Sequence, residues 1–234
     1  MNSTKQKTDP RGGSSRLTPF RGALFDMDGL LIDTERRILQ AAVEAADALS
    51  LGDLRPTLLA MIGLRGDHSR PLLEAALAGR VSLDAFRAEW AARMSELERD
   101  VVAVRPGVTE LLQRLAEQDV PCAVATSTDR GPAIELLERT ALAPFFRSVT
   151  GGDDVVRPKP DPEIYRMAAA TLDIEPGQAC AFEDSNPGTR AAVASGATVV
   201  QVPDLVEPSA EVRALGHVIA PDVLAGARTI GLIA

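Results

Sequence analysis

Two aspartates, Asp26 and Asp28, stand at the end of a short apolar run and are followed at once by Gly29. A buried strand that ends in this way delivers carboxylates to the edge of a sheet. One carboxylate can attack an electrophile and form a covalent intermediate, and a second one beside it can donate and accept a proton. We interpret Asp26 as a candidate nucleophile and Asp28 as its acid/base partner.

A second acidic pair, Glu183 and Asp184, follows another apolar run at 179–182. Ligands of an open parallel sheet bind beyond the carboxyl ends of its strands, so we expect these acids to approach Asp26 and Asp28. Three or four negative charges in one cleft require a cation. Carboxylate oxygens without His or Cys suit a hard ion, and this pattern predicts a Mg²⁺ site.

Groups suited to an anion come from two further segments. Thr126 and Ser127 follow the apolar run 121–125 and precede a predicted helix. The N-terminus of a helix is a typical place for anion binding. Lys159 is the only lysine outside the N-terminal tail, where arginine supplies the other basic side chains. An ammonium is a compact charge that the planar guanidinium cannot always replace. We expect Lys159 to pair with Asp26 and a phosphoryl oxygen.

The elements that must position these residues alternate between strand and helix. The apolar run 121–125 shows no alternation, which predicts a strand buried on both faces. Further strands are predicted at 22–26, 148–150, 179–182, 198–202 and, with a weaker pattern, 217–220. Helical patterns lie between them, which predicts an α/β fold with a parallel, doubly wound sheet.

A helical segment interrupts this alternation directly after the first strand. Helices are predicted from Thr34, which we expect to cap the first of them, and then at 56–62, 69–78 and 82–97. We predict an inserted all-helical domain at 34–103, a core made of 21–33 and 104–234, and a disordered polar tail at 1–20.

Composition excludes several classes of protein. The net charge of −8 argues against a nucleic-acid partner. No apolar run is long enough for a membrane span, and residues 1–20 lack the apolar region of a signal peptide. Cys122 and Cys180 lie in strand-like runs and fit a reducing compartment. We expect a cytoplasmic protein with a monomer as the default state.

Four motifs match one family in order and at reasonable spacing. They are Asp26-Met27-Asp28-Gly29 with Asp33-Thr34-Glu35, Thr126-Ser127, Lys159-Pro160-Asp161-Pro162, and Phe182-Glu183-Asp184-Ser185. Over roughly 20–220 the sequence resembles the haloacid dehalogenase (HAD) superfamily, in the β-phosphoglucomutase-like branch of small phosphatases with a helical cap.

The resemblance implies a Rossmann-like core, a mobile cap at 34–103, and HAD-like phosphoric monoester hydrolysis. By position, Asp26 is the nucleophile and Asp28 protonates the leaving oxygen, while Thr126 and Lys159 hold the phosphoryl group. The Mg²⁺ ligands would be Asp26, Asp28 through its carbonyl, and Asp184, with Glu183 direct or through water.

Two departures weaken a mutase interpretation. The branch's mutases carry a histidine where this chain has Ile38, and their cap-loop arginine is displaced by one residue here, to Arg65. The leading hypothesis is a phosphatase for a small phosphorylated metabolite, such as a sugar phosphate or nucleotide. A phosphosugar mutase and a non-catalytic phosphate-binding module stay as alternatives. Ser127, Arg65 and His68 are candidate substrate-binding residues, and Arg37 and Arg93 are further cap candidates.

Overall fold

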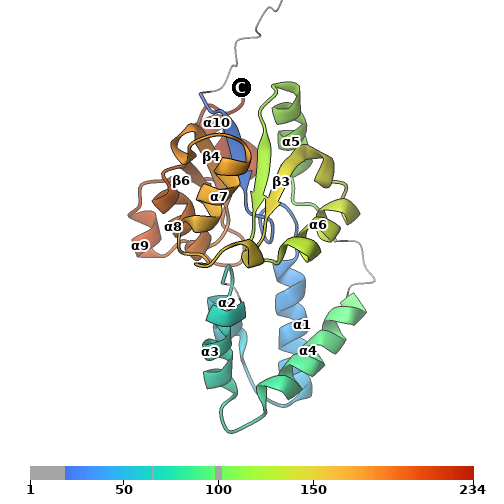
Figure 1. The fold of residues 1–234 in the computed structure, drawn as a ribbon. Coiled ribbons are helices and arrows are strands. Elements are labelled where there is room, and N and C mark those ends of the chain that lie inside the picture. The colour runs from blue at the N-terminus through green and yellow to red at the C-terminus, as the bar shows by residue number, and fades with distance from the viewer. Residues whose placement is uncertain (1–18, 65, 98–101) are drawn as a thin grey trace, which may run out of the picture.

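The computed structural model describes residues 19–64, 66–97 and 102–234 (Figure 1). Within these ranges, six strands form one parallel sheet in the order β3-β2-β1-β4-β5-β6. The strands are β1 Gly22–Phe25, β2 Cys122–Ala125, β3 Phe146–Thr150, β4 Ala179–Glu183, β5 Thr198–Gln201 and β6 Val218–Ile219. This order places the first strand at the centre, with later strands added on both sides, and confirms the predicted doubly wound sheet.

Helices connect the strands and also form a separate group. They are α1 Glu35–Ala48, α2 Arg55–Ala60, α3 Gly66–Leu77, α4 Leu83–Leu97, α5 Val108–Glu117, α6 Arg130–Arg139, α7 Glu163–Thr171, α8 Asn186–Ser195, α9 Ala210–Arg213 and α10 Val223–Thr229. Short 3₁₀ helices occupy Ala143–Phe145, Gly152–Asp154 and Pro176–Gln178. None of the helices in the described ranges has the length and apolarity needed to cross a membrane.

Strand register brings the chemistry to one edge. Phe25, the last residue of β1, is paired with Val124 of β2 and with Phe182 of β4. The three strands therefore end at nearly the same level. The residues that follow them meet there because all the strands run in one direction.

The central strands β1, β2 and β4 are buried on both faces, which the apolar run 121–125 predicts for β2. Phe25 and Phe182 stack at 5.0 Å on the face covered by α5, α6 and α10. Leu24 and Ala181 point to the opposite face, against α7 and α8. The helices α5 and α10 on one side and α7 and α8 on the other thus hold the strand ends rigidly.

Helices α1–α4 form a group of their own beside the sheet (Figure 1). Their interior contains Leu39, Leu58, Leu73 and Phe86, which are almost fully buried. The chain leaves the sheet after β1 and returns to it beside the point of exit. The two connections are joined by a hydrogen bond from the Asp33 amide to the Ala103 carbonyl at 2.9 Å. The helices match the predicted inserted segment, and the exact domain limits stay a prediction.

Some local predictions need adjustment. Residues 1–18 of the predicted tail lie outside the described residues. The helix α9 was not expected; it is a single turn that Ser209 caps by accepting from the Val212 amide at 3.3 Å. Thr34 precedes α1 but makes no capping hydrogen bond with its side chain, because its hydroxyl binds Asp28 instead.

Candidate active site

Asp26 lies directly after β1 and is 6% exposed. Its amide donates to the Phe182 carbonyl at 3.0 Å, which extends the sheet pairing by one residue. Lys159 Nζ donates to Asp26 Oδ1 at 2.5 Å and to Glu183 Oε1 at 2.6 Å. The predicted pairing of Lys159 with Asp26 is thus present in the structure, and Glu183 is a further partner of the lysine.

Glu183 is surrounded by donors. Its Oε1 also accepts from the Tyr165 hydroxyl at 2.9 Å. Its Oε2 accepts from the amides of Asp184 and Ser185 and from the Ser185 hydroxyl, each at 3.0 Å. Both oxygens of this completely buried carboxylate are therefore engaged, and Glu183 serves first to orient Lys159.

The protonation of Asp26 depends on its neighbours. Burial raises the pKa of Asp26 to about 8, Lys159 opposes this change, and Glu183 and Asp28 add to it. Burial also disfavours the charged form of Lys159, but the Asp26 and Glu183 carboxylates outweigh it and hold the pKa of the ammonium above its usual value. A cation beside Asp26 would favour the ionised carboxylate that a nucleophile requires.

The residues present fit a bound Mg²⁺. Oxygen atoms of Asp26, Glu183 and Asp184 all lie within 4.8 Å of one another. Gly29 borders the cluster with φ +83°, and a Cβ there would lie 2.3 Å from Asp184 Oδ2. The backbone thus approaches Asp184 more closely than a side chain at position 29 would allow. The donors are oxygens alone, which is the set that a hard cation prefers.

Glu35 is a fourth acid at this cluster that the sequence analysis did not select. A Cβ on Gly29 would lie 3.0 Å from Glu35 Oε2, so this oxygen and Asp184 Oδ2 face the same small volume. Glu35 Oε2 is buried without a hydrogen-bond partner among the described residues. Burial, followed by the charges of Asp26 and Asp28, raises the pKa of Glu35 to about 9. Its place in the first motif was the available signal, but a first-turn helix acid is usually solvated.

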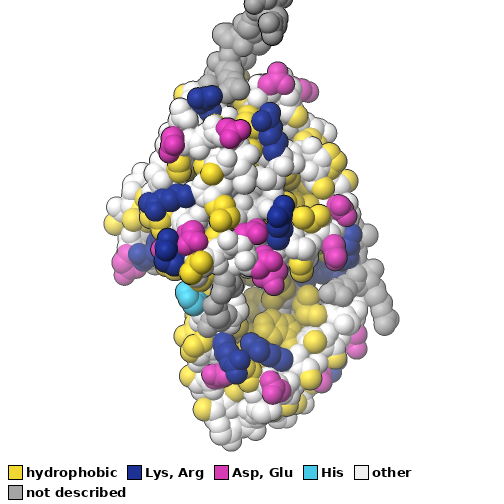
Figure 2. Space-filling model, in the orientation of Figure 1, with side chains coloured by type: hydrophobic (Ala, Val, Ile, Leu, Met, Phe, Trp, Pro, Cys, Tyr) yellow, Lys and Arg dark blue, Asp and Glu magenta, His cyan; other side chains and the backbone are white. Residues whose placement is uncertain are grey.

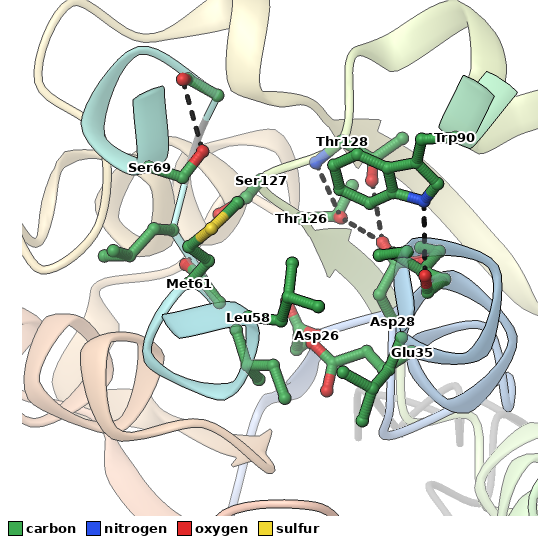
Figure 3. A pocket seen from close by; sticks show the side chains of 17 residues that line it. Asp26, Asp28, Glu35, Leu58, Met61, Ser69, Trp90, Thr126, Ser127 and Thr128 are labelled. Carbon is green, nitrogen blue, oxygen red and sulfur yellow. Dashed lines mark hydrogen bonds between the residues drawn. The ribbon is translucent and has the colours of Figure 1, made fainter. Parts of the chain in front are cut away.

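Both carboxylate oxygens of Asp28 are bound by hydroxyl groups. Its Oδ1 accepts from Thr34 Oγ1 at 2.6 Å. Its Oδ2 accepts from Thr128 Oγ1 at 2.7 Å and from Thr126 Oγ1 at 3.2 Å. Three threonines from two segments thus fix the orientation of Asp28, and Figure 3 shows the contacts made by Thr126 and Thr128. Sequence reasoning selected Thr126 but not Thr34 or Thr128, since a hydroxyl in a loop has no distinctive pattern.

Ser127 contacts the helical group rather than the acids. Its hydroxyl donates to the Gly63 carbonyl at 3.3 Å. Gly63 has φ +75°, and a Cβ there would lie 2.5 Å from Ser185 Oγ. The loop after α2 therefore rests on the core at Ser127 and Ser185, and it covers one side of the acidic cluster.

A cavity of about 290 Å³ lies between the helical group and the strand ends. Asp26, Asp28, Thr126 and Ser127 line it from the core. Figure 2 shows hydrophobic side chains in the hollow between the two parts of the molecule. The candidate nucleophile and acid/base residue thus open onto the same cavity.

The predicted cap residues are distributed differently. Arg65 lies outside the described residues. His68 is exposed on α3 and does not line the cavity. Arg93 pairs with Glu89 at 2.6 Å along α4. Arg37 lines a neighbouring cavity of about 370 Å³. Of these cap positions, Ile38 is the one that contributes to the cavity beside the acids.

Comparisons with known proteins agree with this arrangement. The family model described as haloacid dehalogenase-like hydrolase matches residues 23–202. A phosphorylated carbohydrates phosphatase from Thermotoga maritima is 32% identical over 177 residues, covering 76% of this chain and 82% of that protein. A validoxylamine A 7'-phosphate phosphatase from Streptomyces hygroscopicus subsp. limoneus is also 32% identical, covering 76% of this chain and 83% of that protein.

A solved structure supports the same assignment. A variant of CbbY from Rhodobacter sphaeroides, in complex with xylulose-1,5-bisphosphate, aligns with a TM-score of 0.70 and 25% identity. The alignment covers 87% of this chain and 94% of that chain. The match of the family model across most of the chain, the related sequences and the shared fold lead to one conclusion: the chain belongs to the haloacid dehalogenase-like hydrolase family.

Proposed function

We propose that this chain is a Mg²⁺-dependent phosphatase that hydrolyses a small phosphomonoester, of the sugar phosphate or nucleotide type, through an aspartyl-phosphate on Asp26. The observation that carries the proposal is that Asp26 and Asp28 open onto one cavity while Lys159 is bound to Asp26. Membership of a hydrolase family and relatives named as phosphatases support a phosphoric monoester hydrolase.

The proposed reaction consists of two half-reactions. An Asp26 carboxylate oxygen attacks phosphorus, the ester P–O bond breaks, and Asp28 gives its proton to the leaving oxygen. Asp28 then takes a proton from water, the water oxygen attacks phosphorus, and the bond to Asp26 breaks to release phosphate. Acid–base help of this kind contributes about 10²–10⁴-fold to the rate. Lys159 and Thr126 hold the phosphoryl oxygens, and Ser127 borders the site.

Asp26, Asp184 and the main-chain carbonyl of Asp28 would hold Mg²⁺. Glu183 would act through water, because both of its oxygens already accept hydrogen bonds. When bound, the ion would neutralise negative charge on the transferring phosphoryl group. Lys159 supplies a second positive charge, and it is held in place by Asp26 and Glu183.

Asp26→Asn and Asp28→Asn test the proposal with p-nitrophenyl phosphate as substrate, with Mg²⁺ and with EDTA. We expect Asp26→Asn to abolish turnover, Asp28→Asn to lower kcat by about 10²–10⁴-fold, and EDTA to remove wild-type activity. Asp173→Asn is the control, since Asp173 lies in a turn at φ 57° that asparagine also adopts. Full activity in purified Asp26→Asn protein would refute the proposal.

A phosphosugar mutase is the principal alternative, and the non-catalytic binding module is disfavoured by membership of a hydrolase family. Ile38 lines the cavity where the mutases carry a histidine, and this favours hydrolysis. We expect no conversion of β-glucose 1-phosphate to glucose 6-phosphate in the presence of a priming bisphosphate. Sustained conversion would establish the mutase instead.

We further propose that residues 34–103 act as a cap that closes over the site in a cytoplasmic monomer. The contact between Ser127 and the Gly63 carbonyl supports the closing role. Cys122 and Cys180 are both buried and free, which is compatible with a reducing compartment. Sedimentation of the purified protein tests the monomer, and a dimer mass would contradict it.

A further inference from the structure

The cavity beside Asp26 has an apolar wall. Helix α1 contributes Ile38 and Leu39, α2 and the turn after it contribute Leu58 and Met61, and α4 contributes Trp90. Leu58 and Met61 line the same cavity as Asp26, Asp28 and Glu35 (Figure 3). Ile38 is 37% exposed, so apolar surface is presented to whatever occupies the cavity.

Hydrogen-bonding groups in this wall are already engaged. Trp90 Nε1 donates to the Ile38 carbonyl at 3.2 Å, and the Ser69 hydroxyl donates to the Gly66 carbonyl at 3.2 Å. On the core side, the Ser127 hydroxyl donates to the Gly63 carbonyl. Among the described lining residues from α2, α3 and α4, no side chain carries a charge. Apart from Glu35, whose Oε2 has no hydrogen-bond partner among the described residues, the lining side chains beyond the phosphoryl-binding groups offer a ligand few free hydrogen-bonding groups.

This wall determines which organic group fits beside the phosphoryl group. A ligand hydroxyl that leaves water for a site without a partner loses its hydrogen bonds to water, and each such hydroxyl weakens binding. A hydrocarbon ring or chain has no such hydrogen bonds, and its burial against Leu58, Met61 and Ile38 strengthens binding. A sugar ring, which carries a hydroxyl on most of its carbons, is therefore poorly matched to the cavity.

We propose that the substrate is a phosphomonoester whose organic group is mainly apolar, either aliphatic or aromatic, and that Ile38 and Met61 select it. The inference rests on the proposed phosphatase activity, and it replaces the sugar phosphate or nucleotide as the substrate class with an apolar phosphomonoester. The phosphoryl group lies at Asp26, and the hydrocarbon attached to the ester oxygen lies against the wall of α1, α2 and α4.

Cyclohexylmethyl phosphate and glucose 6-phosphate form a matched pair for the test, since both carry a phosphorylated CH₂ group on a six-membered ring. With Mg²⁺ present, we expect kcat/KM to favour the apolar ester by at least about 100-fold, equivalent to about 2.7 kcal/mol. Equal values, or a preference for glucose 6-phosphate, would overturn the inference and leave the phosphatase proposal intact.

Met61→Gln and Ile38→Gln test the residues of the wall. We expect each to lower kcat/KM for cyclohexylmethyl phosphate by about tenfold while leaving glucose 6-phosphate hydrolysis equal or faster. Leu72→Gln is the control, because Leu72 is 41% exposed on α3 and does not line the cavity. If the two wall variants, shown by Tm to be folded, kept the wild-type ratio between the esters, the assignment of the wall would be wrong.

A binding experiment tests the proposed ligand class independently of the proposed reaction. Calorimetric titration of both esters into Asp26→Asn protein with Mg²⁺ should show tighter binding of cyclohexylmethyl phosphate by at least about tenfold. If wild type hydrolyses neither ester nor p-nitrophenyl phosphate but this preference holds, the phosphatase proposal fails and the apolar ligand class stands. If Asp26→Asn protein binds both esters equally or neither measurably, the ligand class is refuted.

Discussion

At the scale of the residue, Lys159 depends on two carboxylates that are also buried. The ammonium lies between Asp26 and Glu183, and its side chain is 2% exposed. Buried charges persist only when they are paired and hydrogen-bonded. Removing one of these three charged groups would therefore leave the others buried without a full set of partners, which would lower the free energy of unfolding.

Lys159→Met should both inactivate and destabilise the protein. The substitution leaves Asp26 and Glu183 buried without their cation, which costs about 3–5 kcal/mol of unfolding free energy and lowers Tm by roughly 10 °C. Arg157→Met is the control, since the Arg157 side chain is 63% exposed in the same loop. Calorimetry of the metal-free proteins provides the measurement, and equal Tm values for the two variants would contradict the ion-pair interpretation.

Glu35→Gln tests the fourth acid. The pKa of Glu35 is raised from 4.5 to about 9 by burial and by Asp26 and Asp28, so the folded protein retains a proton that the unfolded chain loses above pH 4.5. In EDTA, stability contributed by this proton is present below pH 4.5 and falls as pH rises toward 9. Glu35→Gln should remove this part of the slope and raise Tm at pH 8 by at least about 2 °C.

The same variant reports on the cation. Added Mg²⁺ should raise the Tm of wild type at pH 8 more than that of Glu35→Gln, because the variant has less negative charge to neutralise. Glu44→Gln on the same helix is the control and should follow wild type. A pH slope in EDTA that is identical for all three proteins would show that Glu35 is solvated in solution.

At the scale of the element, the site consists of strand ends joined to one loop of the helical group. β1, β2 and β4 end at one level and deliver Asp26, Thr126 and Glu183. The loop after α2 contacts this edge at Gly63. The pairing of the parallel strands fixes the positions of Asp26, Thr126 and Glu183. The loop after α2, in contrast, contacts this edge of the sheet through a small number of atoms.

Gly63→Ala should weaken the contact between loop and core. A Cβ at this position would lie 2.5 Å from Ser185 Oγ, so the loop must move away from the site. Gly79→Ala is a matched control, because Gly79 also has φ +75° but no atom lies within 4 Å of its Cβ position. Both variants carry the same backbone strain.

The two alanine variants should therefore lose similar stability but differ in catalysis. We expect kcat/KM to fall by about tenfold or more in Gly63→Ala and to stay near wild type in Gly79→Ala. Steady-state kinetics with p-nitrophenyl phosphate and a thermal melt of each variant provide the measurements. Equal kinetics in the two proteins would mean that the loop contact has no role in turnover.

At the scale of the whole molecule, one carboxylate links the sheet to both connections of the helical group. Asp204 follows β5, and its side chain is 1% exposed. Its Oδ1 accepts from Arg36 at 2.5 Å and forms an ion pair with Arg105 at 2.8 Å. These arginines lie at the exit toward α1 and at the return before α5, so Asp204 holds the two connections together.

Asp204→Asn should loosen these connections. Loss of the carboxylate charge weakens a charge-assisted hydrogen bond to Arg36 and an ion pair with Arg105, with an expected cost of about 1–3 kcal/mol. We expect trypsin to cleave near Arg36 and Arg105 faster than in wild type, measured by mass spectrometry of timed digests. Glu207→Gln, at an exposed ion pair in the same segment, is the control. Unchanged cleavage in Asp204→Asn would show that other contacts hold the connections.

The sequence by itself determined the sheet, the inserted helices and the acids of the candidate site. Apolar runs at β1, β2 and β4 are local patterns, and Asp26, Glu183 and Asp184 follow them directly. Parallel strands must end at one edge, so the meeting of these acids follows from the order of the elements. The Lys159 contact with Asp26 was also foreseen, because a single lysine in an arginine-rich chain is a compositional signal.

Only the tertiary structure decided what surrounds these groups. Glu35 and Thr128 have ordinary sequence contexts, and their roles depend on which atoms from distant segments face them. The apolar wall at Ile38 and Met61 likewise arises from the packing of helices against strand ends. A local sequence pattern shows which face of a helix or strand is buried. The lining of a cavity between two elements depends on contacts between segments that are far apart in the sequence.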